Sequence, residues 1–222
     1  MRVMHYSLGD WKDHGENTGG FYACNKYTAK EEDVDSAEAR RRQRAKESLE
    51  RYTHYFERWA NHDSAHRKAL KDMHSITDER LRQLGEVYGI PPSQLRFIVD
   101  ALKQVAECRR VLKFTYAYAY YFMTEETEKQ KNDKEFFEFI QGYAEAQLEK
   151  LNEAAEAELK EHMECPKEAR RSFGDFRFNL TSLTDVAGKH FDKLVQTVES
   201  MPQQLSAADE EGEESSLHLV AI

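Results

Sequence analysis

The feature that most constrains the fold is a helical repeat of apolar residues that returns in segment after segment. In residues 91–123, 134–163 and 166–201, apolar side chains recur every three or four positions. This spacing places them on one face of an α-helix, which must be buried against another element. The repeat consists of Leu95, Ile98, Leu102, Val105, Leu112, Tyr116 and Ala119, then Ile140, Ala144, Leu148, Leu151, Ala155 and Leu159, then Phe173, Phe176, Leu180, Leu183, Ala187, Leu194 and Val198.

A fourth helical segment, residues 35–74, carries an interrupted version of this repeat. Its apolar stripe is Ala45, Leu49, Tyr52, Phe56 and Trp59, and after a lapse at Asp63 and His66 it resumes at Leu70 and Met73. We expect this stripe to face the core. The run FTYAYAYYF at residues 114–122 is aromatic on every side, which predicts burial against several neighbours.

Breaks between these segments set the expected boundaries. Thr77 or Asp78 suits the cap of a short helix that stops at Gly89, and Pro91-Pro92 suits the first turn of the next helix. Residues 124–134 read as a polar connector, and Pro166 as the start of the last long helix.

The expected fold class is therefore all-α. It is an elongated antiparallel bundle of about four long helices plus one short helix, each long helix spanning about 45 to 60 Å at about 1.5 Å per residue. Residues 35–201 form the helical domain, residues 1–30 an irregular strip, and residues 202–222 a disordered acidic tail. The core is expected to contain Trp59, Leu102, Tyr116, Leu151 and Leu183.

Charge and cysteine usage exclude several classes of protein. The net charge is −9, and the only dense basic cluster, Arg40 to Lys46, follows an acidic run, so we interpret it as a solvated helix face and expect no nucleic-acid partner. No apolar run is long enough to predict a membrane span or a signal peptide. Three widely spaced cysteines form no disulfide framework and fit the cytoplasm or nucleus.

The Gly-rich N-terminal strip holds the candidate metal ligands, His14 and Cys24. A structural zinc site takes four nitrogen or sulfur ligands, so these two form half a site. We expect zinc not to be stably bound by this chain, because partial sites bind it poorly.

Four stretches carry a resemblance to a known family: LGDWKDHG at residues 8–15, GFYACNKY at 20–27, SLERYTHYFERW at 48–59 and ECRRVLKFTYAY at 107–118. Over about residues 8–201 the chain resembles the C-terminal part of an Ariadne-type RING-between-RING (RBR) ubiquitin-protein ligase, most like the plant members. The resemblance implies that residues 1–30 are the remnant of a zinc-binding catalytic RING-like domain. It also implies that residues 35–201 are the Ariadne helical domain, which folds back over that catalytic domain and restrains it.

Departures from the family pattern shape the functional expectation. The family's catalytic cysteine would fall before Met1, and two family zinc cysteines correspond to Met4 and Ser7, with His5 the nearest substitute. The resemblance thus implies an RBR-type ubiquitin-protein transferase whose fragment, as written, has no catalytic residue and is inactive alone. Expected partners are the catalytic RING-like domain and, through the parent protein, a cullin-based scaffold or a ubiquitin-conjugating enzyme.

Glu149, Lys68, Ala69 and the two remaining cysteines are further candidates for a functional role. Glu149 matches an acidic family position that faces the catalytic domain, although a solvated surface carboxylate whose removal leaves stability unchanged is an equally good interpretation. Two further positions, which in animal members of the family contact the catalytic domain, are Lys68 and Ala69 in this chain. The resemblance therefore gives less support to a restraint of the catalytic domain like that in the animal members. Cys108 and Cys165 are expected to be incidental. The alternatives are an interaction module, an incomplete ligase, and a helical scaffold with no ubiquitin role.

Overall fold

The computed structural model describes residues 37–76, 78–122, 127–169 and 171–201, and within these ranges the regular structure is entirely helical. This confirms the all-α prediction. The elements in chain order are α1 (Ala37–Ser75), α2 (Asp78–Tyr88), a 3₁₀ turn (Pro92–Leu95), α3 (Arg96–Phe122), α4 (Glu128–Glu153), a π-helical turn (Ala154–Glu158), α5 (Leu159–Glu164) and α6 (Phe173–Ser200). The expected strip at residues 1–30 and tail at residues 202–222 lie outside the described residues.

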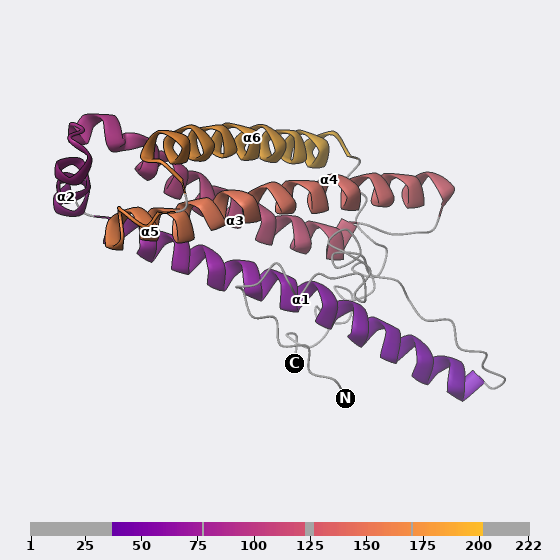
Figure 1. The fold of residues 1–222 in the computed structure, drawn as a ribbon. Coiled ribbons are helices and arrows are strands. Elements are labelled where there is room, and N and C mark those ends of the chain that lie inside the picture. Colours follow the sequence, from indigo (N-terminus) through magenta and orange to yellow (C-terminus); the bar gives the residue numbers. More distant parts are fainter. Residues whose placement is uncertain (1–36, 77, 123–126, 170, 202–222) are drawn as a thin grey trace, which may run out of the picture.

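The long helices form an elongated bundle around α3 (Figure 1). Helices α1, α4 and α6 pack against α3, and α6 also packs along α4. Cross-helix contacts fix the directions: Asp63 with Lys113 and Arg51 with Tyr120 make α1 antiparallel to α3. Helix α4 returns antiparallel to α3, because Gln141 meets Thr115 and Glu149 meets Arg109. Therefore α1 and α4 run in the same direction along α3, and they meet where His62 lies 3.3 Å from Glu145.

The core follows the apolar repeats of α3, α4 and α6 closely. Leu102, Tyr116 and Leu151 belong to one buried cluster, and Trp59 and Leu183 pack against it partly buried. Fully buried Leu95 ends the 3₁₀ turn, Ile98 and Leu112 lie on α3, and Leu148 on α4 and Leu180 on α6 belong to the same cluster. This confirms the predicted core.

One predicted helix boundary is confirmed by the structure, and two others differ from it. Gly89 ends α2 with a φ of +65°, a conformation that glycine adopts without strain. The predicted connector 124–134 is too long, because Thr127 and Gln130 form a capping box that starts α4 at Glu128. The last long helix begins at Phe173 rather than Pro166, because the Ser172 side chain accepts the backbone N–H of Asp175 and caps it there.

The prediction for the apolar stripe of α1 is wrong for its first part, whereas Trp59, Leu70 and Met73 pack partly buried against the core. Its buried residues are Tyr55, His62, Ala65 and Ala69. Leu49, Tyr52 and Phe56 are 65%, 47% and 48% exposed, respectively. The alanines explain the choice of face, because small side chains allow α1 and α3 to approach closely.

The aromatic end of α3 is also less buried than predicted. Tyr116 is buried, but Tyr121 is 55% exposed and Phe114 is 53% exposed. Tyr52 stacks on Phe56 and meets Tyr120 edge-on, with ring centroids 5.5 and 6.0 Å apart, respectively. The middle of α1 and the end of α3 therefore share one surface of exposed and partly buried side chains, here named the α1–α3 aromatic face: Leu49, Tyr52, Phe56, Trp59, Tyr120 and Tyr121.

Candidate docking site

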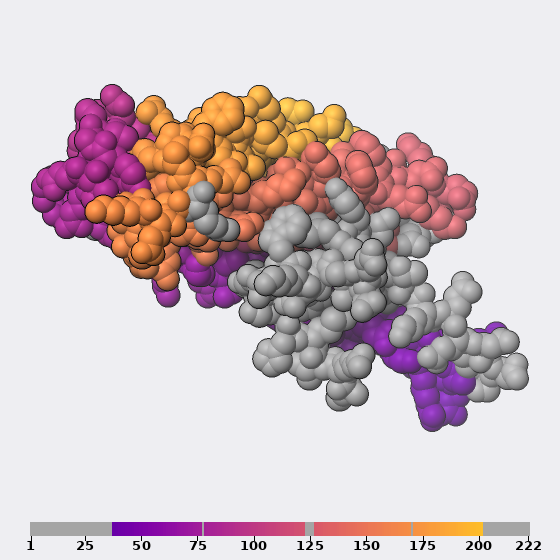
Figure 2. Space-filling view, viewed as in Figure 1, coloured from indigo at the N-terminus to yellow at the C-terminus, as the bar shows by residue number. Residues whose placement is uncertain are grey.

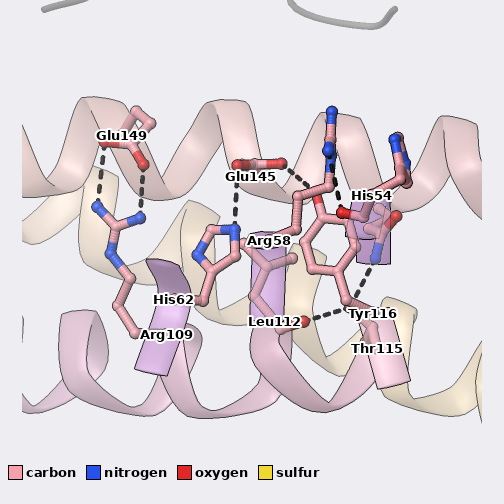
Figure 3. A network of polar contacts seen from close by, with 10 residues as sticks. His54, Arg58, His62, Arg109, Leu112, Thr115, Tyr116, Glu145 and Glu149 are labelled. Atoms are coloured by element: carbon pink, nitrogen blue, oxygen red, sulfur yellow. Dashed lines mark hydrogen bonds and ion pairs between the residues drawn. The ribbon is translucent and has the colours of Figure 1, made fainter. Parts of the chain in front are cut away.

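Polar side chains join α1, α3 and α4 along the side of the bundle where α1 and α4 run in parallel. This row, here named the α1–α4 seam, is the richest polar arrangement among the described residues. Figure 3 shows its inner part, in which α4 carboxylates point toward side chains of α1 and α3. Its members are His62, Lys68, Asp72, Arg109, Tyr116, Glu145, Glu149 and Glu156.

The innermost contact of the seam is centred on Glu145. Its carboxylate lies 3.3 Å from Nε2 of His62 and accepts the Tyr116 hydroxyl at 3.1 Å (Figure 3). His62 is 5% exposed, and its ring stacks on Tyr116 with centroids 5.3 Å apart. Burial alone raises the pKa of Glu145, but His62, the Tyr116 hydroxyl and the charge of Arg109 together lower that pKa below its ordinary value. The site therefore favours a charged carboxylate.

The next contact is a two-pronged ion pair between Arg109 and Glu149. The two guanidinium nitrogens of Arg109 donate to the two carboxylate oxygens of Glu149 at 2.7 and 3.1 Å (Figure 3). The Arg109 side chain is 4% exposed and that of Glu149 25%. The interpretation of Glu149 as a solvated carboxylate with no structural role is therefore wrong, because a buried arginine depends on it. Its role in docking stays a prediction.

The outer end of the seam is open to solvent. Lys68 on α1 donates to Asp72 at 2.8 Å and to Glu156 of the π-helical turn at 2.5 Å. The side chain of Lys68 is 60% exposed, while Ala69 beside it is buried. Partial burial acts to lower the pKa of Lys68, but the two carboxylates outweigh burial and raise it. Lys68 therefore stays charged at neutral pH.

The inner contacts of the seam are more buried than the outer ones, and the two therefore suit different roles. The pairs at Glu145 and Glu149 are enclosed and hold the three helices in register. The charges at Lys68, Asp72 and Glu156 are accessible, and exposed ion pairs contribute only about 0 to 1 kcal/mol each. A protein partner can exchange them for its own charges at little energetic cost. The outer seam is thus suited to recognition rather than to catalysis.

Cys108 does not have the surroundings of an activated nucleophile. Cys108 is fully buried, and Gln104 donates to its Sγ at 3.3 Å. Burial raises the pKa of the Cys108 thiol to about 12, so it holds its proton at neutral pH. Cys165 is exposed at the end of α5. The expectation that Cys108 is inert agrees with this geometry.

The candidate zinc ligands cannot be placed. His14 and Cys24 lie outside the described residues. Within residues 37–76, 78–122, 127–169 and 171–201, no three His, Cys, Asp or Glu side chains converge as a metal site would require. Zinc binding by His14 and Cys24 stays a prediction. Likewise, none of the described helices has the length and apolar character needed to cross a bilayer.

Comparison with known proteins adds what the geometry cannot supply. A family model described as the Ariadne domain matches residues 50–205, which include most of α1 and all later helices. The chain belongs to the Ariadne domain family. This confirms the resemblance inferred from the sequence motifs.

Curated relatives extend the match across most of this chain. The probable E3 ubiquitin-protein ligases ARI8 and ARI7 of Arabidopsis thaliana are 43% and 45% identical to it over 203 and 194 residues, covering 91% and 87% of this chain, respectively. The probable E3 ubiquitin-protein ligase rbrA of Dictyostelium discoideum is 30% identical over 200 residues, or 86% of the chain. These matches cover 35%, 34% and 34% of the relatives, respectively, so the chain spans about a third of their length.

The sequence contains one indication of the seam, a charged residue at a position of the apolar repeat. On α3 the repeat runs Leu102, Val105, Leu112 and Tyr116, and Arg109 occupies the position where an apolar residue is missing. A charge on a buried face requires an opposite charge nearby. Its partner, Glu149, comes from a Glu-rich helix whose other carboxylates fit the same pattern equally well.

Proposed function

We propose that this chain serves as the regulatory docking module of an RBR ubiquitin-protein ligase in the ubiquitination pathway. In this role the helical domain, residues 35–201, binds the catalytic RING-like domain and restrains it. The family match over residues 50–205, together with relatives that are named E3 ubiquitin-protein ligases, carries the proposal. The interaction-module interpretation also fits the described geometry, which offers recognition surfaces and a protonated, buried thiol.

The outer seam is the surface that we assign to the catalytic domain. Lys68 and Glu156 lie on different helical segments and present opposite charges side by side, so a partner must match their arrangement. Glu149 supports this surface from within through Arg109. The Arabidopsis relatives provide a natural catalytic domain for a test in trans.

Further features of a parent ligase follow from the same proposal. We assign residues 1–30 to the remnant of the catalytic RING-like domain, where His14 and Cys24 form an incomplete zinc site that does not hold zinc stably. Contacts with a ubiquitin-conjugating enzyme and a cullin-based scaffold would be made through the parent protein, in the cytoplasm or nucleus. This chain alone should form no ubiquitin thioester that a reducing agent can remove.

The deciding experiment measures binding and inhibition together. The purified chain is titrated into the catalytic RING-like domain of ARI8, and the rate at which that domain passes ubiquitin to lysine is followed. We expect binding and a slower transfer, and we expect Lys68→Glu to weaken both by placing a third carboxylate beside Asp72 and Glu156.

Lys189→Glu is the matched control. Lys189 also pairs with an aspartate one helical turn away, Asp185 at 2.6 Å, but it lies on α6. It should bind and inhibit like the unchanged chain. A folded chain that neither binds nor inhibits at about 50 µM, a concentration corresponding to about 6 kcal/mol of binding free energy, would refute the docking proposal. The helical-scaffold alternative would then be the remaining one, although the comparisons give it no support.

A further inference from the structure

The α1–α3 aromatic face is a second recognition surface that the docking proposal does not use. Leu49, Tyr52, Phe56 and Tyr121 are each between 47% and 65% exposed. The rings form a continuous stack, since Phe56 contacts Trp59 at 6.1 Å and Tyr120 contacts Tyr121 at 4.9 Å. A contiguous exposed apolar patch marks an interaction site.

One end of this face is strongly basic. Arg42 lies seven residues before Leu49, just as Leu49 lies seven before Phe56, so these residues share one side of α1. Arg42 already pairs with the exposed Glu38 at 2.6 Å, and Arg41 and Arg44 are exposed in the same stretch. From the start of α1 onward, this surface is first basic and then aromatic. A segment that binds along it in the same direction must therefore be acidic first and apolar after that.

A segment of this chain has that composition. Residues 209–214 read DEEGEE and residues 217–222 read LHLVAI, so an acidic run is followed by an apolar one. The segment also has sufficient reach. From Met201, which follows α6, to Leu217 there are 16 residues, which extend to about 53 Å at about 3.3 Å per residue. That is longer than α3, whose 27 residues span about 40 Å at about 1.5 Å each.

We propose that residues 209–222 dock on the α1–α3 aromatic face. The carboxylates of residues 209–214 pair with Arg41, Arg42 and Arg44, and the apolar side chains of residues 217–222 lie against Tyr52 and Phe56. This proposal replaces, for this segment, the disorder expected from its composition. It is independent of the outer seam and of the docking function assigned there.

A second copy of the chain fits this face less well. Specific protein interfaces bury about 800 Å² on each partner, whereas the exposed aromatic face consists of a few side chains at the edge of two helices. A short tethered segment needs less area, because the chain already holds it at a high effective concentration. Charged pairs at the basic end would also make the contact sensitive to salt.

Photo-crosslinking in the full chain tests the proposal. A benzophenone amino acid replaces Leu219, the chain is irradiated at low concentration, and crosslinked peptides are mapped by mass spectrometry. We expect crosslinks within one molecule to the α1 peptide that contains Tyr52 and Phe56, or to the α3 peptide that contains Tyr121. Phe56→Ser should lower their yield about tenfold, the change that a loss of about 1.4 kcal/mol produces. Raised salt should lower the yield as well.

Phe139→Ser is the matched control, because Phe139 is 58% exposed on α4 and stacks on Tyr143 instead. It should leave the crosslinks unchanged, and circular dichroism should show every variant folded. Crosslinks that map chiefly to α4 or α6 would overturn the proposal. So would crosslinks between molecules that grow with concentration, which indicate a second copy, or a yield on α1 that Phe56→Ser does not change.

Discussion

Replacing Glu149 with alanine should destabilise the bundle substantially, although a quarter of its side chain reaches solvent. The change leaves Arg109, which is 4% exposed, without the carboxylate that both of its terminal nitrogens bind. Removing one partner of a buried ion pair costs about 3 to 5 kcal/mol. The solvent access of Glu149 reduces this, so we expect about 2 to 3 kcal/mol. For a helical domain of this size, that corresponds to a fall in melting temperature of about 5 to 10 °C.

Urea and thermal unfolding followed by circular dichroism measure the effect. Glu153→Ala is the control, because Glu153 is exposed one turn further along α4, and it should change stability by less than about 0.5 kcal/mol. The double variant Arg109→Met/Glu149→Leu should recover much of the loss, since an apolar pair can replace a buried ion pair. If Glu149→Ala unfolds at the same urea concentration as the unchanged chain, the ion pair does not support the bundle and the reasoning fails.

The remaining predictions use the same assays. Leu151→Ala, at a fully buried site, should cost about 2 to 5 kcal/mol, whereas Phe56→Ala on the exposed face should stay within about 1 kcal/mol; equal losses would contradict the observed faces. The folded pKa of Glu145 lies below its ordinary value of 4.5. Its contribution to the free energy of unfolding is therefore present above about pH 4.5 and is lost as the pH falls through the folded pKa. Glu145→Gln should make stability depend less on pH in this acidic range. A thiol reagent at neutral pH should label Cys165 rapidly and Cys108 only on unfolding; rapid labelling of both would refute the buried-thiol assignment.

The repeats on α3, α4 and α6 predict the fold well because those helices are buried on broad faces. Their periodic apolar residues, such as Leu112 and Leu148, are fully buried, as the repeat predicts. Helix α1 shows where this argument fails. Its most apolar stripe lies outside, because the close approach to α3 is made by Ala65 and Ala69. Hydrophobicity alone does not report how near two backbones can come.

The candidate site was less predictable than the fold, for a similar reason. The family resemblance selected Glu149 as a surface residue, but its ion pair depends on Arg109, 40 positions away in sequence. The π-helical turn that carries Glu156 has no sequence signature comparable to the Thr127 cap. Contacts between distant residues and local changes of helical pitch emerge only when the helices are placed together.

The small number of large apolar residues that α1 buries has a mechanical consequence. Helix α1 is 39 residues long, yet none of its buried residues, Tyr55, His62, Ala65 and Ala69, precedes residue 55. The first turns of the helix extend away from the rest of the bundle (Figure 2). Because no buried side chain holds residues 37–50 against the bundle, this stretch should bend more readily than α3, α4 and α6. A partner that holds it would therefore move the start of α1 without displacing the buried cluster.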